Sequence, residues 1–140
     1  MDRYKFRGKV DIEVTNEIEE HIKDGWVYGN LIGKSLIVGD VIDLDDQYFN
    51  TEFWISVKAE TVGQYTGKQD FDKLDVYEHD IVMDFMDGNY YLVVWDADSA
   101  SFLLVPNKGE WMDFETFEEH ASVGYRVVGT KFDNKELLEG

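Results

Sequence analysis

Cysteine is absent from this chain of 140 residues, and the sequence has a single proline, Pro106. Without cysteine, disulfide bonds and thiol chemistry are both excluded. No apolar run approaches the roughly 18 residues that cross a bilayer, and the charged start at residues 1–6 lacks the apolar segment of a secretory signal. These absences predict a cytoplasmic protein that does not bind membranes.

Basic residues are scarce as well. The chain has 13 Lys and Arg against 30 Asp and Glu, which gives a net charge of −17. Between Leu74 and Tyr125 a single base, Lys108, stands against twelve acids. A surface of this sign repels phosphate backbones, so ordinary nucleic-acid binding is disfavoured. Two interpretations of the acidity stay open: it keeps the protein soluble, or it mimics nucleic acid or docks on a basic partner.

Apolar and aromatic residues are plentiful. Hydrophobic residues make up 44% of the chain, with nine Phe, eight Tyr and four Trp, which is ample for a packed core. Strand patterns dominate, and we expect strands within residues 10–14, 26–33, 36–44, 53–66, 80–86, 90–95, 102–105 and 125–130. The tripeptide Asp87-Gly88-Asn89 predicts a hairpin turn, and residues 15–24 predict a short helical turn.

One further helix is predicted at residues 113–121, where Asp113 can cap the start and Phe114, Phe117 and Ala121 share a face. The fold class is therefore mainly β. We expect an N-terminal β region over residues 1–67, a connecting loop over 68–74, and a small SH3-like antiparallel barrel with one short helix over 75–140. One compact domain overall is the alternative to two.

Phosphate-binding and calcium-binding templates both fail. Three residues separate Gly63 from Gly67, and Gln69 follows Lys68, so the P-loop spacing is not met. The densest group of potential metal ligands lacks the glycine and glutamate that an EF-hand needs, and we interpret it as a solvated acidic loop. Its members are Asp70, Asp72, Asp75, Glu78, His79 and Asp80.

The remaining chemistry is equally sparse. The three histidines follow no zinc-ligand spacing, and no Gly-x-Ser-x-Gly elbow occurs around any serine. We therefore predict no metal site, no cofactor and no catalytic residues, and we do not expect an enzyme. The aromatic residues are interpreted mainly as core and cross-strand pairs.

Five segments together resemble the YopX family of phage and prophage proteins, in order and spacing over nearly the whole chain. The most specific is Thr61-Val62-Gly63-Gln64-Tyr65-Thr66-Gly67; the others are residues 4–8, 27–31, 75–82 and 127–138. The family usually has Gly where His79 stands, so a turn at that position must tolerate histidine here. The resemblance implies a mostly β fold and a phage or prophage origin, hence a host bacterial cell, and it brings no established activity.

We interpret the chain as a non-enzymatic accessory protein that binds an unknown protein partner, with homo-oligomerisation through sheet edges left open. The candidate functional residues are Gly63, Gln64, Tyr65, Thr66, Gly67, Tyr77, Glu78, His79 and Asp80. Two alternatives remain. The acids between Asp75 and Glu119 could form one face that mimics nucleic acid and inhibits a DNA-binding protein. Otherwise a ligand-binding or enzymatic pocket could lie near Tyr65, Tyr77 and His79.

Overall fold

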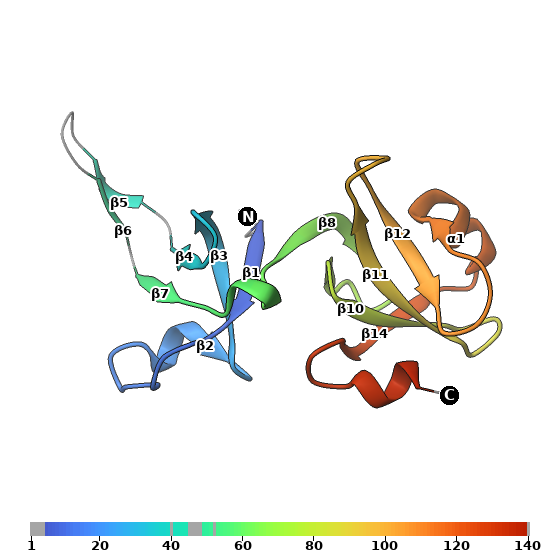
Figure 1. Cartoon of the computed structure of the whole chain (residues 1–140), viewed down its shortest axis with the longest axis horizontal. Helices are drawn as coiled ribbons and strands as arrows, with labels where there is room; N and C mark the ends of the chain where they lie inside the picture. Colours follow the sequence, from blue (N-terminus) through green and yellow to red (C-terminus); the bar gives the residue numbers. More distant parts are fainter. Residues whose placement is uncertain (1–4, 40, 45–48, 52, 140) are drawn as a thin grey trace. The chain divides into compact units, whose positions relative to one another are not determined.

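The computed structural model describes residues 5–39, 41–44, 49–51 and 53–139 (Figure 1). The chain divides into two compact units, Met1–Tyr65 and Thr66–Gly140. Tyr4, which opens the first family-like segment, and residue 40, within the predicted 36–44 strand, lie outside the described residues. The described part is mainly β, which confirms the predicted fold class. None of its helices is long and apolar enough to cross a membrane.

The first unit is built on an antiparallel sheet in which β1 lies between β3 and β8, and β3 continues to β4 and β7. The register places Phe6 opposite Gly29 and Lys9 opposite Trp26. A separate two-stranded sheet pairs β5 with β6. The bounds are β1 Phe6–Lys9, η1 Glu19–His21, β2 Ile22–Lys23, β3 Trp26–Ile32, β4 Leu36–Val38, β5 Val41–Leu44, β6 Phe49–Thr51, β7 Trp54–Ser56, η2 Ala59–Thr61 and β8 Gly63–Gln69.

The core of the first unit is aliphatic. Val27, Ile37, Ile55 and Val57 are almost fully buried and pack together. They come from β3, β4, β7 and the residue after β7, so three neighbouring strands of the sheet supply this core. The predicted strand at residues 10–14 is wrong: Val10 makes one isolated bridge, to Val57, and residues 11–14 carry no strand.

The second unit is a curled antiparallel sheet in the order β13, β12, β11, β10, β14, with a short helix, α1, packed on it (Figure 1). Gly88, at a φ of 71°, turns β10 into β11 as the Asp-Gly-Asn tripeptide predicts. The bounds are β9 Asp75–Tyr77, β10 Asp80–Asp84, β11 Tyr90–Asp96, β12 Ser101–Pro106, β13 Met112–Asp113, α1 Phe114–His120, β14 Tyr125–Thr130 and η3 Lys135–Leu138.

Helix α1 is where the sequence predicts it. The side chain of Asp113 accepts a hydrogen bond from the Thr116 amide at 2.8 Å, which caps the helix start. The fully buried Phe117 lies edge-on to Tyr91 and Tyr125, with ring centroids 5.0 and 5.1 Å apart. These aromatic contacts fix the helix on the sheet.

The passage between the units differs from the expected loop. β8 continues to Gln69, so residues 68 and 69 of the predicted 68–74 loop are strand. Thr66 Oγ1 donates a hydrogen bond to the Val76 carbonyl at 2.7 Å, which ties β8 to β9. The expectation of a solvated acidic loop is also wrong in part, because Asp70 is 6% and Asp80 is 1% exposed. Backbone amides satisfy both carboxylates.

Replacing Phe117 with Ala should remove the centre of the second core. We expect the free energy of unfolding to fall by about 3–5 kcal/mol, as for other buried Phe-to-Ala changes. Urea denaturation followed by near-ultraviolet circular dichroism measures the loss. The control is Val123→Ala, at a side chain that is 54% exposed, which should change stability by no more than about 0.5 kcal/mol. A loss below about 1 kcal/mol for Phe117→Ala would show that the aromatic cluster does not hold the helix.

Candidate functional site

The Gly63–Gly67 block is a strand segment and not a phosphate loop. Gly63 and Gln64 pair with Arg7 and Phe6 of β1, and the Tyr65 amide donates a hydrogen bond to the Lys5 carbonyl. Gly67 has a φ of 85°, in the left-handed region that favours glycine. These contacts are architectural, as strand pairing requires.

The second group of predicted residues forms the turn between β9 and β10. The Asp80 carboxylate accepts a hydrogen bond from the Tyr77 amide at 2.8 Å across that turn. His79 has a φ of 79°, so the position for which the resemblance implied Gly adopts a left-handed conformation. Its amide donates to the Val93 carbonyl and its ring lies 5.0 Å from that of Phe132, edge-on. The side chain of Glu78 lies 3.7 Å from the imidazole.

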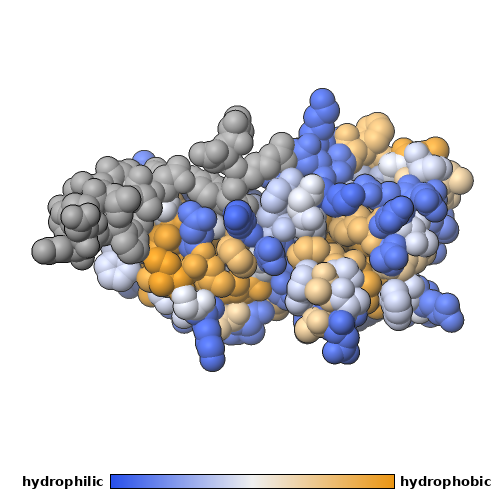
Figure 2. Space-filling view, turned by 90° about the horizontal axis from the view of Figure 1, so that it is seen from above, coloured by the Kyte–Doolittle hydropathy of each residue, from blue (hydrophilic) through white to orange (hydrophobic). Residues whose placement is uncertain are grey.

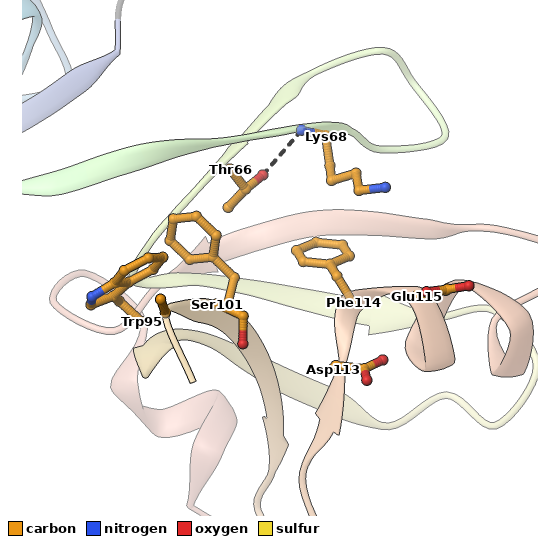
Figure 3. Close-up of a pocket in the computed structure, with 9 residues that line it drawn as sticks. Thr66, Lys68, Trp95, Ser101, Asp113, Phe114 and Glu115 are labelled. Atoms are coloured by element: carbon orange, nitrogen blue, oxygen red, sulfur yellow. Dashed lines mark hydrogen bonds between the residues drawn. The ribbon is translucent and has the colours of Figure 1, made fainter. Parts of the chain in front are cut away.

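An open groove lies on the second unit (Figure 3), and its walls are formed by residues outside the β9–β10 turn. We call it the aromatic groove. It has a volume of about 460 Å³ and is lined by Thr66, Lys68, Trp95, Ala100, Ser101, Phe102, Asp113, Phe114 and Glu115. Of the nine predicted candidate residues, Thr66 lines it. Neither Tyr77 nor His79 does, and Tyr77 is only 4% exposed.

Sheet register builds the aromatic wall of this groove. Trp95 on β11 is directly opposite Phe102 on β12, and their rings meet edge-on with centroids 4.9 Å apart. Phe114 begins α1 and is 8% exposed, whereas Trp95 is 40% exposed and offers its indole to solvent. The groove therefore presents one accessible aromatic ring above a buried apolar floor.

The rim of the aromatic groove is acidic. The Lys68 ammonium lies 2.9 Å from a carboxylate oxygen of Glu118, so its charge is neutralised. Asp113 and Glu115 remain, and the backbone amide of Thr116 lowers the pKa of Asp113. Negative charge is thus maintained along the rim at neutral pH.

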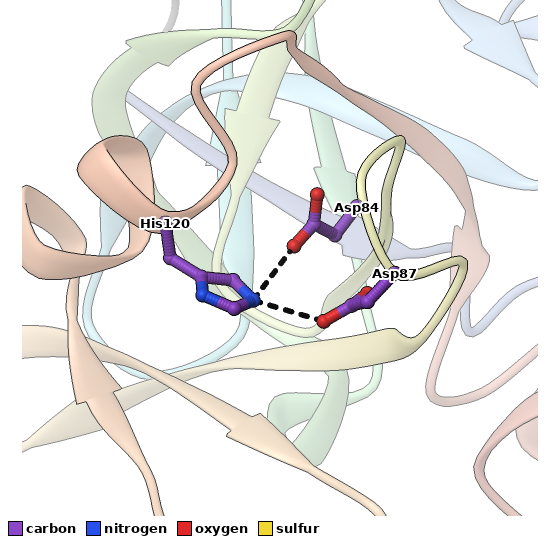
Figure 4. A group of neighbouring side chains, drawn as sticks. All are labelled: Asp84, Asp87 and His120. Carbon is purple, nitrogen blue, oxygen red and sulfur yellow. Dashed lines mark hydrogen bonds and ion pairs between the residues drawn. The ribbon is translucent and has the colours of Figure 1, made fainter.

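A second site lies at the far end of the helix, where His120 meets the β10–β11 hairpin (Figure 4). His120 Nε2 lies 3.0 Å from Asp84 Oδ2 and 2.9 Å from Asp87 Oδ2. Asp84 is fully buried, while Asp87 and His120 are partly exposed. We call these three residues the Asp–Asp–His cluster.

Hydrogen bonds set the charge states of this cluster. The hydrogen bond to Asp87 raises the pKa of His120, against the opposing effect of desolvation. Desolvation on its own would raise the pKa of Asp87, but hydrogen bonds from His120, the Asn89 amide and Tyr91 together lower it. Burial and the same carboxylate raise the pKa of Tyr91 to about 12. The cluster favours a cation next to two carboxylates.

Sequence reasoning did not find either site. The Trp95–Phe102 pair depends on the register of a hairpin. The alternation of apolar and polar residues does not determine that register, because a shift of two residues keeps each side chain on the same face. Asp84 and His120 are far apart in sequence and meet only because α1 ends beside the hairpin. Two features of the sequence could have indicated the Asp–Asp–His cluster. They are the Asp-x-x-Asp spacing of Asp84 and Asp87 at a predicted turn, and His120 at the end of a predicted helix.

Two small β units, one of which carries a short helix on a curled sheet, define the class of protein. The sequence pattern of the family described as YopX protein matches residues 14–139. The chain therefore belongs to the YopX family, as the five segments predicted. Comparison with curated proteins returns no match.

The strain at position 79 can be measured with two variants that both lose the imidazole contact with Phe132. For His79→Gly we expect a change in unfolding free energy within about 1 kcal/mol, because relief of the left-handed conformation offsets the lost contact. For His79→Val, a β-branched residue in the same conformation, we expect a loss of about 1–3 kcal/mol. Chemical denaturation measures both. Equal stabilities for the two variants would contradict a left-handed residue 79.

The raised pKa of His120 makes stability depend on pH. Because protonated His120 is favoured in the folded state, its contribution is full below the ordinary value of 6.5 and is lost as the pH rises through the folded pKa. The stability difference between the wild type and His120→Gln should therefore shrink above pH 6.5. NMR titration in metal-free buffer gives the pKa directly, and Asp87→Asn should lower it. A His120 pKa below 6.5 would rule the arrangement out.

Proposed function

We propose that the protein is a non-enzymatic interaction module whose aromatic groove binds a segment of a partner protein with apolar and basic side chains. The observation that carries this proposal is the exposed indole of Trp95, which lines the groove together with Phe102 and Phe114. Tryptophan rings that keep exposed surface next to an apolar floor are typical anchors at protein interfaces. The groove is wide and open, which suits a side chain of a partner rather than an enclosed small molecule.

Charge supports a basic partner. Lys68 is neutralised by Glu118, so Asp113 and Glu115 determine the sign of the rim. The whole chain has a net charge of −17. Such a surface attracts a basic partner over long range and repels nucleic acid. Figure 2 shows both apolar and hydrophilic side chains on the visible face of the molecule.

The family supports the biological setting of this proposal. A phage or prophage origin, with action in the cytoplasm of a host bacterial cell, is what the resemblance implies for a YopX protein. An accessory protein of that origin would meet host proteins as its partners. The aromatic groove provides the surface on which we place that contact.

The nucleic-acid mimic receives less support. Of the twelve acids between Asp75 and Glu119, Asp80 and Asp84 are buried and hold backbone amides, so they contribute nothing to a surface. Glu118 pairs with Lys68. These three carboxylates have structural partners, whereas a mimic needs them free for a DNA-binding protein.

Affinity capture from host lysate with matched variants tests the groove. Trp95→Ala should reduce recovery of the specific partner at least about 10-fold, as expected for an interface anchor. Trp111→Ala removes an indole that is 61% exposed but is not part of the groove, and it should leave recovery unchanged. The recovered protein should be basic, and binding to the purified partner should weaken with added salt.

Three results would contradict the proposal. One is equal loss with both tryptophan variants. Another is that Trp95→Ala recovers as much of the partner as the wild type does. The third is a partner that DNA competes away regardless of residue 95, which would favour the nucleic-acid mimic instead.

A further inference from the structure

We propose that the Asp–Asp–His cluster binds a divalent first-row transition ion, with Asp84 Oδ2, Asp87 Oδ2 and His120 Nε2 as its three protein ligands. These atoms all lie within 4.8 Å of one another, and Figure 4 shows both carboxylates directed at the imidazole nitrogen. The site is separate from the aromatic groove, with which it shares no residue.

The separations between the ligand atoms fit an ion. The imidazole nitrogen lies 2.9 and 3.0 Å from the two carboxylate oxygens. Two ligand atoms that are each roughly 2.1 Å from an ion and 90° apart lie about 3.0 Å from each other. The same separations suit hydrogen bonds, so the distances alone do not distinguish a proton from an ion. The hydrogen bonds of the two carboxylates favour an ion, because one of their oxygens has no donor.

A single N–H donor faces both carboxylates. A ring nitrogen carries at most one hydrogen, and the hydrogen bond of His120 Nε2 goes to Asp87. Asp84 Oδ2 lies 3.0 Å from the same nitrogen, yet it has no hydrogen-bond donor, and the Asp84 side chain is 0% exposed. A buried carboxylate oxygen without a donor is unfavourable by itself. An ion between these atoms would satisfy this oxygen, Asp87 and the imidazole at once.

The rest of each carboxylate is held by the hairpin. Asp84 Oδ1 accepts a hydrogen bond from the Met86 amide, and Asp87 Oδ1 accepts one from the Asn89 amide, each at 2.8 Å. Tyr91 also donates its hydroxyl to Asp87 Oδ2 at 3.0 Å. Such outer hydrogen bonds orient the carboxylates of metal sites. Each aspartate therefore has its second oxygen directed at the imidazole before any ion arrives.

The ligand set selects the kind of ion. One imidazole nitrogen with two carboxylate oxygens suits zinc and its first-row neighbours better than Mg²⁺ or Ca²⁺, which prefer oxygen ligands alone. Two carboxylates with a neutral imidazole balance the charge of a divalent ion. The side chains of His120 and Asp87 are 43% and 28% exposed, so water can reach the ion and complete its coordination.

Isothermal titration calorimetry of the untagged full-length protein with Zn²⁺ tests this site. We expect saturable binding of one ion per chain that excess Mg²⁺ does not displace. His120→Gln should weaken binding at least about 10-fold, and Asp87→Asn should do the same. The control is His21→Gln, at a histidine of the first unit that stacks on Phe53, and it should bind as the wild type does.

A second measurement guards against loss of fold. Circular dichroism of the His120 and Asp87 variants should match the wild type, since both side chains are partly exposed. Binding of Co²⁺ should give visible absorption bands in the wild type that are absent in His120→Gln. The proposal is overturned if Zn²⁺ shows no saturable binding, if Mg²⁺ displaces it as from any acidic surface, or if His120→Gln retains the wild-type affinity.

Discussion

The second unit depends on buried carboxylates that accept backbone hydrogen bonds. Asp80 and Asp84 stand at the two ends of β10 and are 1% and 0% exposed. Asp80 holds the Tyr77 amide and Asp84 holds the Met86 amide, so each carboxylate closes the turn next to it. A buried charge without partners costs several kcal/mol. Any conformation that opens either turn removes a backbone partner from a carboxylate, which favours the observed turns at the two ends of β10.

This constraint links the fold to the Asp–Asp–His cluster. Asp84 gives one oxygen to the hairpin and turns the other toward His120, which ends α1. The helix position is in turn fixed by Phe117 between two tyrosine rings. Asp84 thus stabilises the hairpin with one carboxylate oxygen, while its other oxygen faces the imidazole of His120. The aromatic groove at the opposite end of α1 depends on the same helix through Asp113 and Phe114.

The sequence predicted those parts of the fold that depend on interactions between residues close together in the chain. The Asp87-Gly88-Asn89 turn, the Asp113 cap and the apolar face of α1 are all short-range features, and they are present. The family segments indicated that a turn at position 79 must tolerate histidine in place of glycine, and the structure shows that His79 has a positive φ. Register and long-range contact decide the rest. The groove needs Trp95 opposite Phe102, and the cluster needs β10 beside the end of α1, and neither arrangement has a periodic signature.

The acidic composition has more than one physical origin. Asp70, Asp80 and Asp84 are interior hydrogen-bond acceptors whose partners are backbone amides, so they are needed whatever the surface binds. The carboxylates at the groove rim and Asp87 face solvent and set the field that a partner or an ion meets. Composition alone predicts that all of these acids lie on the surface, where their charge would repel the phosphates of nucleic acid. At two places the remaining negative charge lies beside a specific side chain, an exposed indole at the groove and an imidazole at the cluster. We attribute the selectivity that we propose for each site to this pairing of charge with a specific side chain, and not to the net charge.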